Sequence, residues 1–144
     1  DGVEVKAQTR SICARFCGAE ATFEGVYLKP APGCTEKERD RTQNAVDAAT
    51  KAKNDAKVEA LLTAQLETCA KALSWLEGVG ARTELAAAQM RQGRKADCLK
   101  TLGALIEDAD ASDDKLKEKY SDFDLYRYEA SLQALRETLK QCRA

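Results

Sequence analysis

Six cysteines are the residues of this chain best suited to chemistry, and no histidine accompanies them. The cysteines are Cys13, Cys17, Cys34, Cys69, Cys98 and Cys142. An even number of cysteines in 144 residues is typical of disulfides formed in an oxidising compartment. Zinc sites commonly combine cysteine with histidine, so this composition argues against a metal or other cofactor. We therefore predict a secreted or periplasmic protein, and expect that a signal peptide was removed ahead of Asp1.

The spacing of the first two cysteines leaves a metal alternative open. Cys13 and Cys17 are separated by three residues, which is not the Cys-x-x-Cys spacing of thiol oxidoreductases. With Cys34 they would supply three thiolates for zinc or Cu(I). The interpretation that we favour is that these cysteines form disulfides and tie the N-terminal segment to the rest of the chain.

The pairing of the six cysteines has 15 possible connectivities. Residues four apart on a helix cannot be bridged without distorting the turn, so Cys13 and Cys17 each need a separate partner. We expect one bridge from Cys34 to Cys13 or Cys17, and at least one bridge between two of the three later cysteines. Each bridge would add about 2–4 kcal/mol of stability by restricting the unfolded chain.

Catalysis without histidine would rest on paired carboxylates. Two such pairs exist, Asp113 with Asp114 and Asp122 with Asp124. Both pairs lie at expected helix starts, where acidic side chains are stabilised by the helix dipole. The Ser-His-Asp and Cys-His arrangements are excluded by composition. We predict that the protein is not an enzyme.

Each of the three later cysteines lies on an apolar stripe of helical period. The stripes consist of Leu62, Leu66, Cys69, Leu73 and Leu76; of Cys98, Leu102, Leu105 and Ala109; and of Leu125, Tyr128, Leu132, Leu135, Leu139 and Cys142. Charged residues make up 33% of the chain and aromatic residues only 6%, a composition typical of helices that pack through small side chains. The sequence therefore predicts an all-α fold, a disulfide-stabilised bundle of four to five helices.

The longest helix is expected over about residues 36–77. Thr35 and Glu38 form a capping-box motif at its start, and Gly78 and Gly80 follow its end. The apolar stripe changes register near Asp55, so the alternative is a second helix capped at that residue. Shorter helices are expected over about 82–92, 95–109 and 115–142, the last with a possible second capping point at Ser121 and Asp124.

The N-terminal quarter of the chain has a different character. Residues 1–10 are polar and indicate a loose or short extended lead-in, followed by a short helix over 11–21 that carries Cys13 and Cys17. Residues 25–34 contain two prolines and two glycines, which predict an extended connector. We expect a single domain over 1–144, in which segment 1–34 is stapled to the helical body 35–144.

Within residues 85–110, Leu85 and the small residue Ala86 are followed by Gly93 and then by Cys98 and Leu102. In this order they resemble a single tetratricopeptide-type (TPR-like) helical hairpin, in which a leucine and a small residue pack the first helix, a glycine closes the turn, and a small residue followed by large ones packs the second helix. The aromatic residues of the first helix and the terminal proline of the motif are replaced, and nothing similar recurs 34 residues away. The resemblance implies a protein-interaction module with Ala86, Gln89 and Met90 near its concave face.

Four aromatic residues lie within nine positions, from Tyr120 to Tyr128. One helix cannot bury them all, so we predict a partner-binding patch made of Tyr120, Phe123, Tyr126 and Arg127, residue types that are enriched at binding hot spots. The alternative is that Phe123 and Tyr126 cover the 25–34 connector.

The balance of charge and hydropathy limits the kinds of partner. The net charge of −1 gives no electrostatic basis for nucleic-acid binding, and no apolar run is long enough to span a bilayer. We therefore predict a protein that binds a protein or another macromolecule. A small-molecule or lipid carrier with a cavity between helices and a cysteine-thiolate metal-binding protein are the alternatives.

Overall fold

The computed structural model describes residues 2–6 and 25–144 of the chain, which divides into two units, 1–30 and 31–144. The described part of the first unit is an antiparallel ribbon of β1 (Gly2–Val5) and β2 (Gly25–Leu28), with Val3 opposite Tyr27. The extended lead-in and connector are therefore confirmed where they are described. The helix predicted over 11–21, with Cys13 and Cys17, lies outside the described residues.

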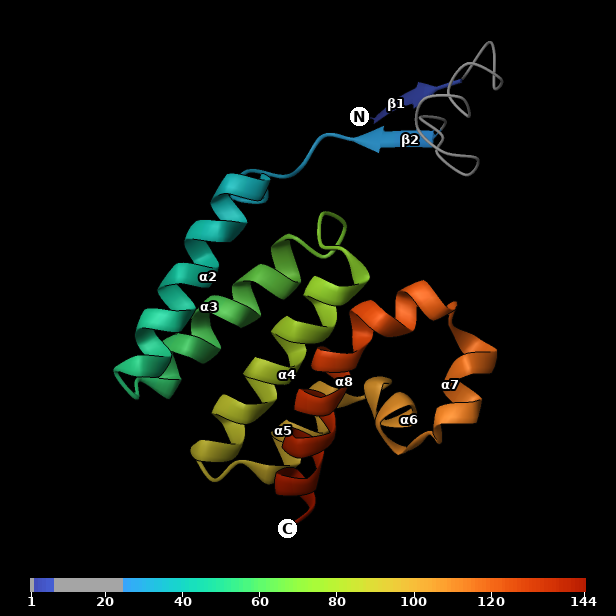
Figure 1. Cartoon of the computed structure of the whole chain (residues 1–144). Coiled ribbons are helices and arrows are strands. Elements are labelled where there is room, and N and C mark those ends of the chain that lie inside the picture. Colours follow the sequence, from blue (N-terminus) through green and yellow to red (C-terminus); the bar gives the residue numbers. More distant parts are fainter. Residues whose placement is uncertain (1, 7–24) are drawn as a thin grey trace. The chain divides into compact units, whose positions relative to one another are not determined.

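The second unit is helical, and the predicted all-α, disulfide-containing bundle is confirmed (Figure 1). Its helices are α2 (Glu36–Lys51), α3 (Asp55–Thr68), α4 (Trp75–Arg91), α5 (Lys95–Leu102), α6 (Leu105–Asp110), α7 (Asp113–Lys119) and α8 (Asp122–Arg143). These are seven helices in the described residues rather than four to five, because several predicted helices are each divided by a cap or a glycine.

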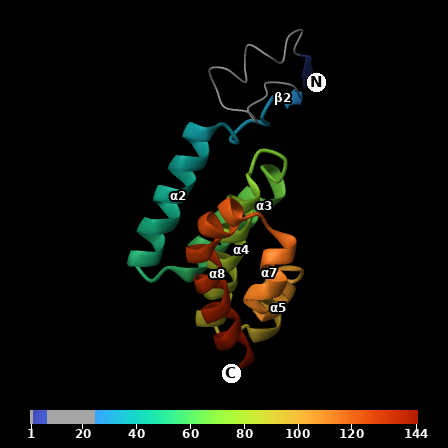
Figure 2. The same cartoon turned by 45° about the vertical axis from the view of Figure 1, so that its right-hand side comes forward.

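The single long helix predicted over 36–77 is wrong. The chain reverses at Ala52–Asn54, where Lys53 adopts a left-handed φ of 55°. Asn54 then caps α3, its side chain accepting a hydrogen bond of 3.1 Å from the Lys57 amide. The register change near Asp55 therefore marks a turn at the end of α2 (Figure 2). The helices on either side of this turn, α2 and α3, pack on each other (Figure 1).

The predicted helix end at Gly78 and Gly80 is also wrong, because both glycines lie inside α4. Ser74 and Glu77 form a capping box at the start of this helix: Glu77 Oε2 accepts from the Ser74 amide at 2.7 Å, and Ser74 Oγ accepts from the Glu77 amide at 3.2 Å. The same Ser/Thr-x-x-Glu signature that starts α2 at Thr35 therefore starts α4. The predicted start near residue 82 is seven residues too late.

Two more predicted helices are divided. Gly103, with a φ of 41°, separates α5 from α6 inside the predicted helix 95–109. Ser121 caps α8, accepting a hydrogen bond of 3.2 Å from the Asp124 amide, so the possible capping point at Ser121 is a real helix start.

The helix α4 lies between two apolar cores. It packs against α3 on one side and against α5 and α8 on the other. Ala81, Leu85 and Ala88 face the core shared with α2 and α3, whereas Val79 and Ala86 face the core shared with α5 to α8. Small side chains on both faces let the neighbouring helices approach closely, which explains the alanine content of this segment.

Candidate binding surfaces

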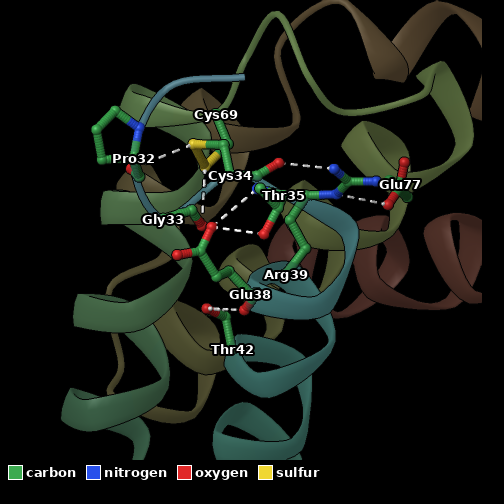
Figure 3. Close-up of a disulfide and its surroundings, with 9 residues drawn as sticks. All are labelled: Pro32, Gly33, Cys34, Thr35, Glu38, Arg39, Thr42, Cys69 and Glu77. Atoms are coloured by element: carbon green, nitrogen blue, oxygen red, sulfur yellow. Dashed lines mark hydrogen bonds and ion pairs between the residues drawn. A yellow bond between two sulfur atoms is a disulfide. The ribbon is translucent and has the colours of Figure 1, made fainter. Parts of the chain in front are cut away.

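The first disulfide joins Cys34 to Cys69, with their Cα atoms 5.3 Å apart (Figure 3). It links the residue that precedes the α2 cap to the C-cap of α3, and both cysteines are buried. The predicted pairing of Cys34 with Cys13 or Cys17 is therefore wrong. A cluster of three free thiolates at Cys13, Cys17 and Cys34 is excluded for the same reason.

An arginine connects this disulfide to α4. Arg39 Nη1 donates to the Cys34 carbonyl at 2.8 Å, and its Nε donates to Glu77 Oε1 at 3.1 Å (Figure 3). Burial raises the pKa of Glu77, but hydrogen bonds from Ser74 and Arg39 outweigh it and hold the pKa below its usual value. Glu77 therefore stays ionised at neutral pH and ties the ends of α2 and α4 together.

The second disulfide joins Cys98 on α5 to Cys142 on α8, with Cα atoms 6.0 Å apart. Both cysteines are buried in the core shared by α4 to α8. The expectation of a bridge between two of the three later cysteines is confirmed by this pair. In the described ranges, no group of three or more Cys, Asp or Glu side chains is arranged to hold a metal ion.

The four residues of the predicted partner-binding patch do not all lie on one surface. Tyr120 turns inward: its ring stacks on Trp75 at 5.5 Å between centroids, and its hydroxyl donates to Asp108 Oδ2 at 2.6 Å. Phe123 and Tyr126 instead lie on the outer face of α8 and are 67% and 79% exposed. Their neighbour is the Arg127 guanidinium, 5.6 Å from the Phe123 ring centroid.

We define the exposed aromatic face as Phe123, Tyr126 and Arg127. It lies opposite the apolar stripe through which α8 enters the core, since Tyr128 and Leu132 are buried. Large exposed aromatic side chains with an arginine are typical of protein-binding hot spots. Two exposed acidic side chains, Asp122 and Glu129, lie at the edge of this face next to Tyr126 by helical spacing.

Asp108 has a role that no motif in the sequence predicts. This aspartate is 4% exposed and accepts hydrogen bonds from Lys119 Nζ at 2.5 Å, Tyr120 Oη and Tyr128 Oη. Burial raises its pKa, but these donors outweigh burial and hold the pKa below the usual range. The available signal was an aspartate beside the stripe residues Leu105 and Ala109, a position where a buried charged group needs partners.

A pocket of about 340 Å³ lies beside this cluster. Its lining includes Trp75 and Arg82 of α4, Leu105 and Asp108 of α6, and Tyr120. Trp75 lies at a helix edge, 41% exposed and packed on Tyr120 and Tyr128.

Two of the three residues that the TPR-like resemblance places near a concave face are buried in this unit, whereas Met90 is half-buried against the core shared by α4 to α8. Ala86 is fully buried, and Gln89, 7% exposed, accepts from Thr101 Oγ1 at 2.7 Å. The Gly93 turn between α4 and α5 has a φ of 77°, the left-handed conformation that glycine adopts without strain.

The fold and these surfaces define a class, an all-α bundle cross-linked by two disulfides in its described part. The disulfides are consistent with an extracellular or other oxidising compartment. None of the described helices is long and apolar enough to cross a membrane. Comparison of the chain with protein-family models, curated proteins and solved structures finds no match.

Proposed function

We propose that this is a non-enzymatic, secreted or periplasmic protein that binds another protein through its exposed aromatic face. The observation that carries the proposal is the exposure of Phe123 and Tyr126, 67% and 79%, on a helix whose other face is fully packed. Leaving two large aromatic rings in water forgoes on the order of 2 kcal/mol of burial energy for each ring. A partner that covers both rings would recover that energy.

The chemistry of the face favours a protein partner. Arg127 beside Phe123 supplies a donor that pairs with a carboxylate or a backbone carbonyl, and Tyr126 adds a hydroxyl at the edge of an apolar ring. Asp122 and Glu129 at the rim would repel the phosphates of a nucleic acid or an anionic membrane. The complementary partner has an apolar pocket with basic groups around it.

The test is affinity isolation of the partner from extracts of the native source, followed by measurement of Kd. The double variant Phe123→Ala with Tyr126→Ala is expected to weaken binding by about thirtyfold or more, since truncating even one hot-spot residue costs about 2 kcal/mol. The control is Lys140→Ala with Gln141→Ala, exposed positions on the same helix about 20 Å further along its axis.

Thermal unfolding of both double variants checks that the bundle is intact, because all four positions are exposed. Equal affinity of the wild type and the aromatic double variant for an isolated partner would contradict the proposal. So would an equal loss of affinity in the control variant, because the effect would then not be specific to this face.

A further inference from the structure

The pocket beside Asp108 has a mostly apolar wall and room for a small ligand. Trp75, Leu66, Leu73, Val79 and Leu105 line it, and its volume is about 340 Å³. Ligand pockets in proteins begin at about 300 Å³. Taking about 30 Å³ for a water-sized group, the pocket holds on the order of ten non-hydrogen atoms.

One charged group of the wall has no partner of opposite charge. The Arg82 guanidinium donates only to the Gly78 carbonyl, at 3.3 Å, and no described carboxylate pairs with it. Most other arginines of the unit are paired, for example Arg39 with Glu77 and Arg143 with Asp110. The fork of donors on Arg82 is therefore available to a ligand that enters the pocket.

The other charged group of the wall is already satisfied. Asp108 accepts from Lys119, Tyr120 and Tyr128, and the ammonium of Lys119 lies 2.5 Å from its Oδ1. The Asp108–Lys119 pair is neutral overall, so the wall presents one net positive charge, that of Arg82. A cationic ligand would be repelled, and a neutral apolar ligand would leave the guanidinium without an ionic partner.

We propose that this pocket binds a small amphipathic carboxylate, a molecule with one carboxylate group and an apolar body of on the order of ten non-hydrogen atoms. The carboxylate pairs with Arg82, and the apolar body packs against Trp75, Leu66 and Leu105. Arginine and carboxylate match geometrically through two parallel hydrogen bonds. This site is distinct from the exposed aromatic face and does not depend on its function.

The test uses octanoate as the probe and the fluorescence of Trp75, the lone tryptophan of the chain, as the reporter. Octanoate has a carboxylate and an apolar chain of the required size, and 1-octanol is its neutral analogue. Saturable quenching or enhancement of Trp75 emission is expected with octanoate. A markedly weaker response is expected with 1-octanol, since it cannot form the charge-assisted pair. Isothermal titration calorimetry gives the Kd of each.

Two variants locate the site. Arg82→Gln is expected to weaken octanoate binding by about tenfold or more, the loss typical of a hydrogen bond to a charged group. Arg41→Gln, which removes an exposed arginine on α2 that does not line the pocket, is expected to leave binding unchanged. Ala70→Phe places a large ring at an exposed position of the lining and is expected to block the pocket without disturbing the core.

The proposal is overturned if octanoate causes no saturable change in the wild type, or if 1-octanol binds as tightly. It is also overturned if Arg82→Gln or Ala70→Phe binds octanoate with the affinity of the wild type. Thermal unfolding of each variant shows whether a loss of binding reflects the site or the fold. None of these results bears on Phe123 or Tyr126.

Discussion

The hydroxyl of Tyr128 lies 3.2 Å from Oδ2 of Asp108, and both side chains are buried. The bond joins α8 to the six-residue helix α6. Burial, and next the negative charge of Asp108, raise the pKa of Tyr128 far above its usual value, so its hydroxyl stays a neutral donor. A helix as short as α6 is not stable alone and depends on such contacts.

Tyr128→Phe keeps the ring in the core and removes only this donor. The free energy of unfolding is expected to fall by about 1–3 kcal/mol, because Asp108 loses one of its three side-chain donors. Urea denaturation followed by circular dichroism measures the change. Tyr126→Phe, at a position 79% exposed, is the control and is expected to change stability by less than about 0.5 kcal/mol. Equal effects of the two variants would contradict the buried hydrogen bond.

The lowered pKa of Asp108 predicts a dependence on pH. A carboxyl group whose pKa is lower in the folded than in the unfolded state stabilises the fold when ionised. Its contribution is complete above the unfolded pKa of about 4, and it is lost as the pH falls through the folded pKa. Asp108→Asn is therefore expected to be destabilising at neutral pH, with a difference from wild type that shrinks below about pH 4.

Denaturant unfolding of wild type and Asp108→Asn at several pH values measures this difference. Subtracting the two curves removes the contribution of other carboxyl groups with lowered pKa, such as Glu77 and Asp110. A difference that stays constant from neutral pH into the acid range would show that ionisation of Asp108 does not stabilise the fold.

Thr83 is a site where stability can be increased. Its hydroxyl is buried in α4 and has no hydrogen-bond partner in the described part of the chain. Thr83→Val preserves the shape and removes the unsatisfied group, so we expect a gain of about 1 kcal/mol or more. The matched control Thr101→Val breaks the 2.7 Å hydrogen bond to Gln89 and is expected to lose about 1 kcal/mol. The thermal unfolding midpoints of the two variants measure these effects. If both midpoints shift in the same direction, the Thr83 hydroxyl is not an unsatisfied group.

The two disulfides are expected to contribute similar amounts. They close loops of 35 and 44 residues, for which restriction of the unfolded chain predicts about 4 kcal/mol each. Replacing Cys34 and Cys69 by alanine, or Cys98 and Cys142, should lower the free energy of unfolding by about that amount. Removing the Cys98–Cys142 bridge should lower the free energy of unfolding somewhat more, because its sulfur atoms fill the core shared by α4 to α8. Guanidinium denaturation measures both, and a loss below about 1 kcal/mol would show that the bridge is dispensable.

Local sequence signals determined the helical class and several boundaries. The stripe from Leu125 to Cys142 forms the buried face of α8, and Ser121 caps its start. Helical period and caps are properties of neighbouring residues, so they can be recognised in the sequence without knowledge of the fold. The Ser74–Glu77 capping box could be recognised in the same way. It was missed because the apolar stripe from Leu62 to Leu76 continues through it and suggests an unbroken helix.

The tertiary structure alone decided which segments meet. The pairing of Cys34 with Cys69 requires α2 to reverse onto α3 at Lys53, and that reversal follows from burying two apolar faces together. Tertiary contacts also decide that Tyr120 packs inward while Phe123 stays exposed. The Tyr120 ring stacks on Trp75 and its hydroxyl donates to Asp108, residues of two other helices. The sequence by itself determined the helical class and the positions in the chain that carry thiols and aromatic rings. Contacts between residues far apart in the chain decided which of them are buried, bridged or left exposed for a partner.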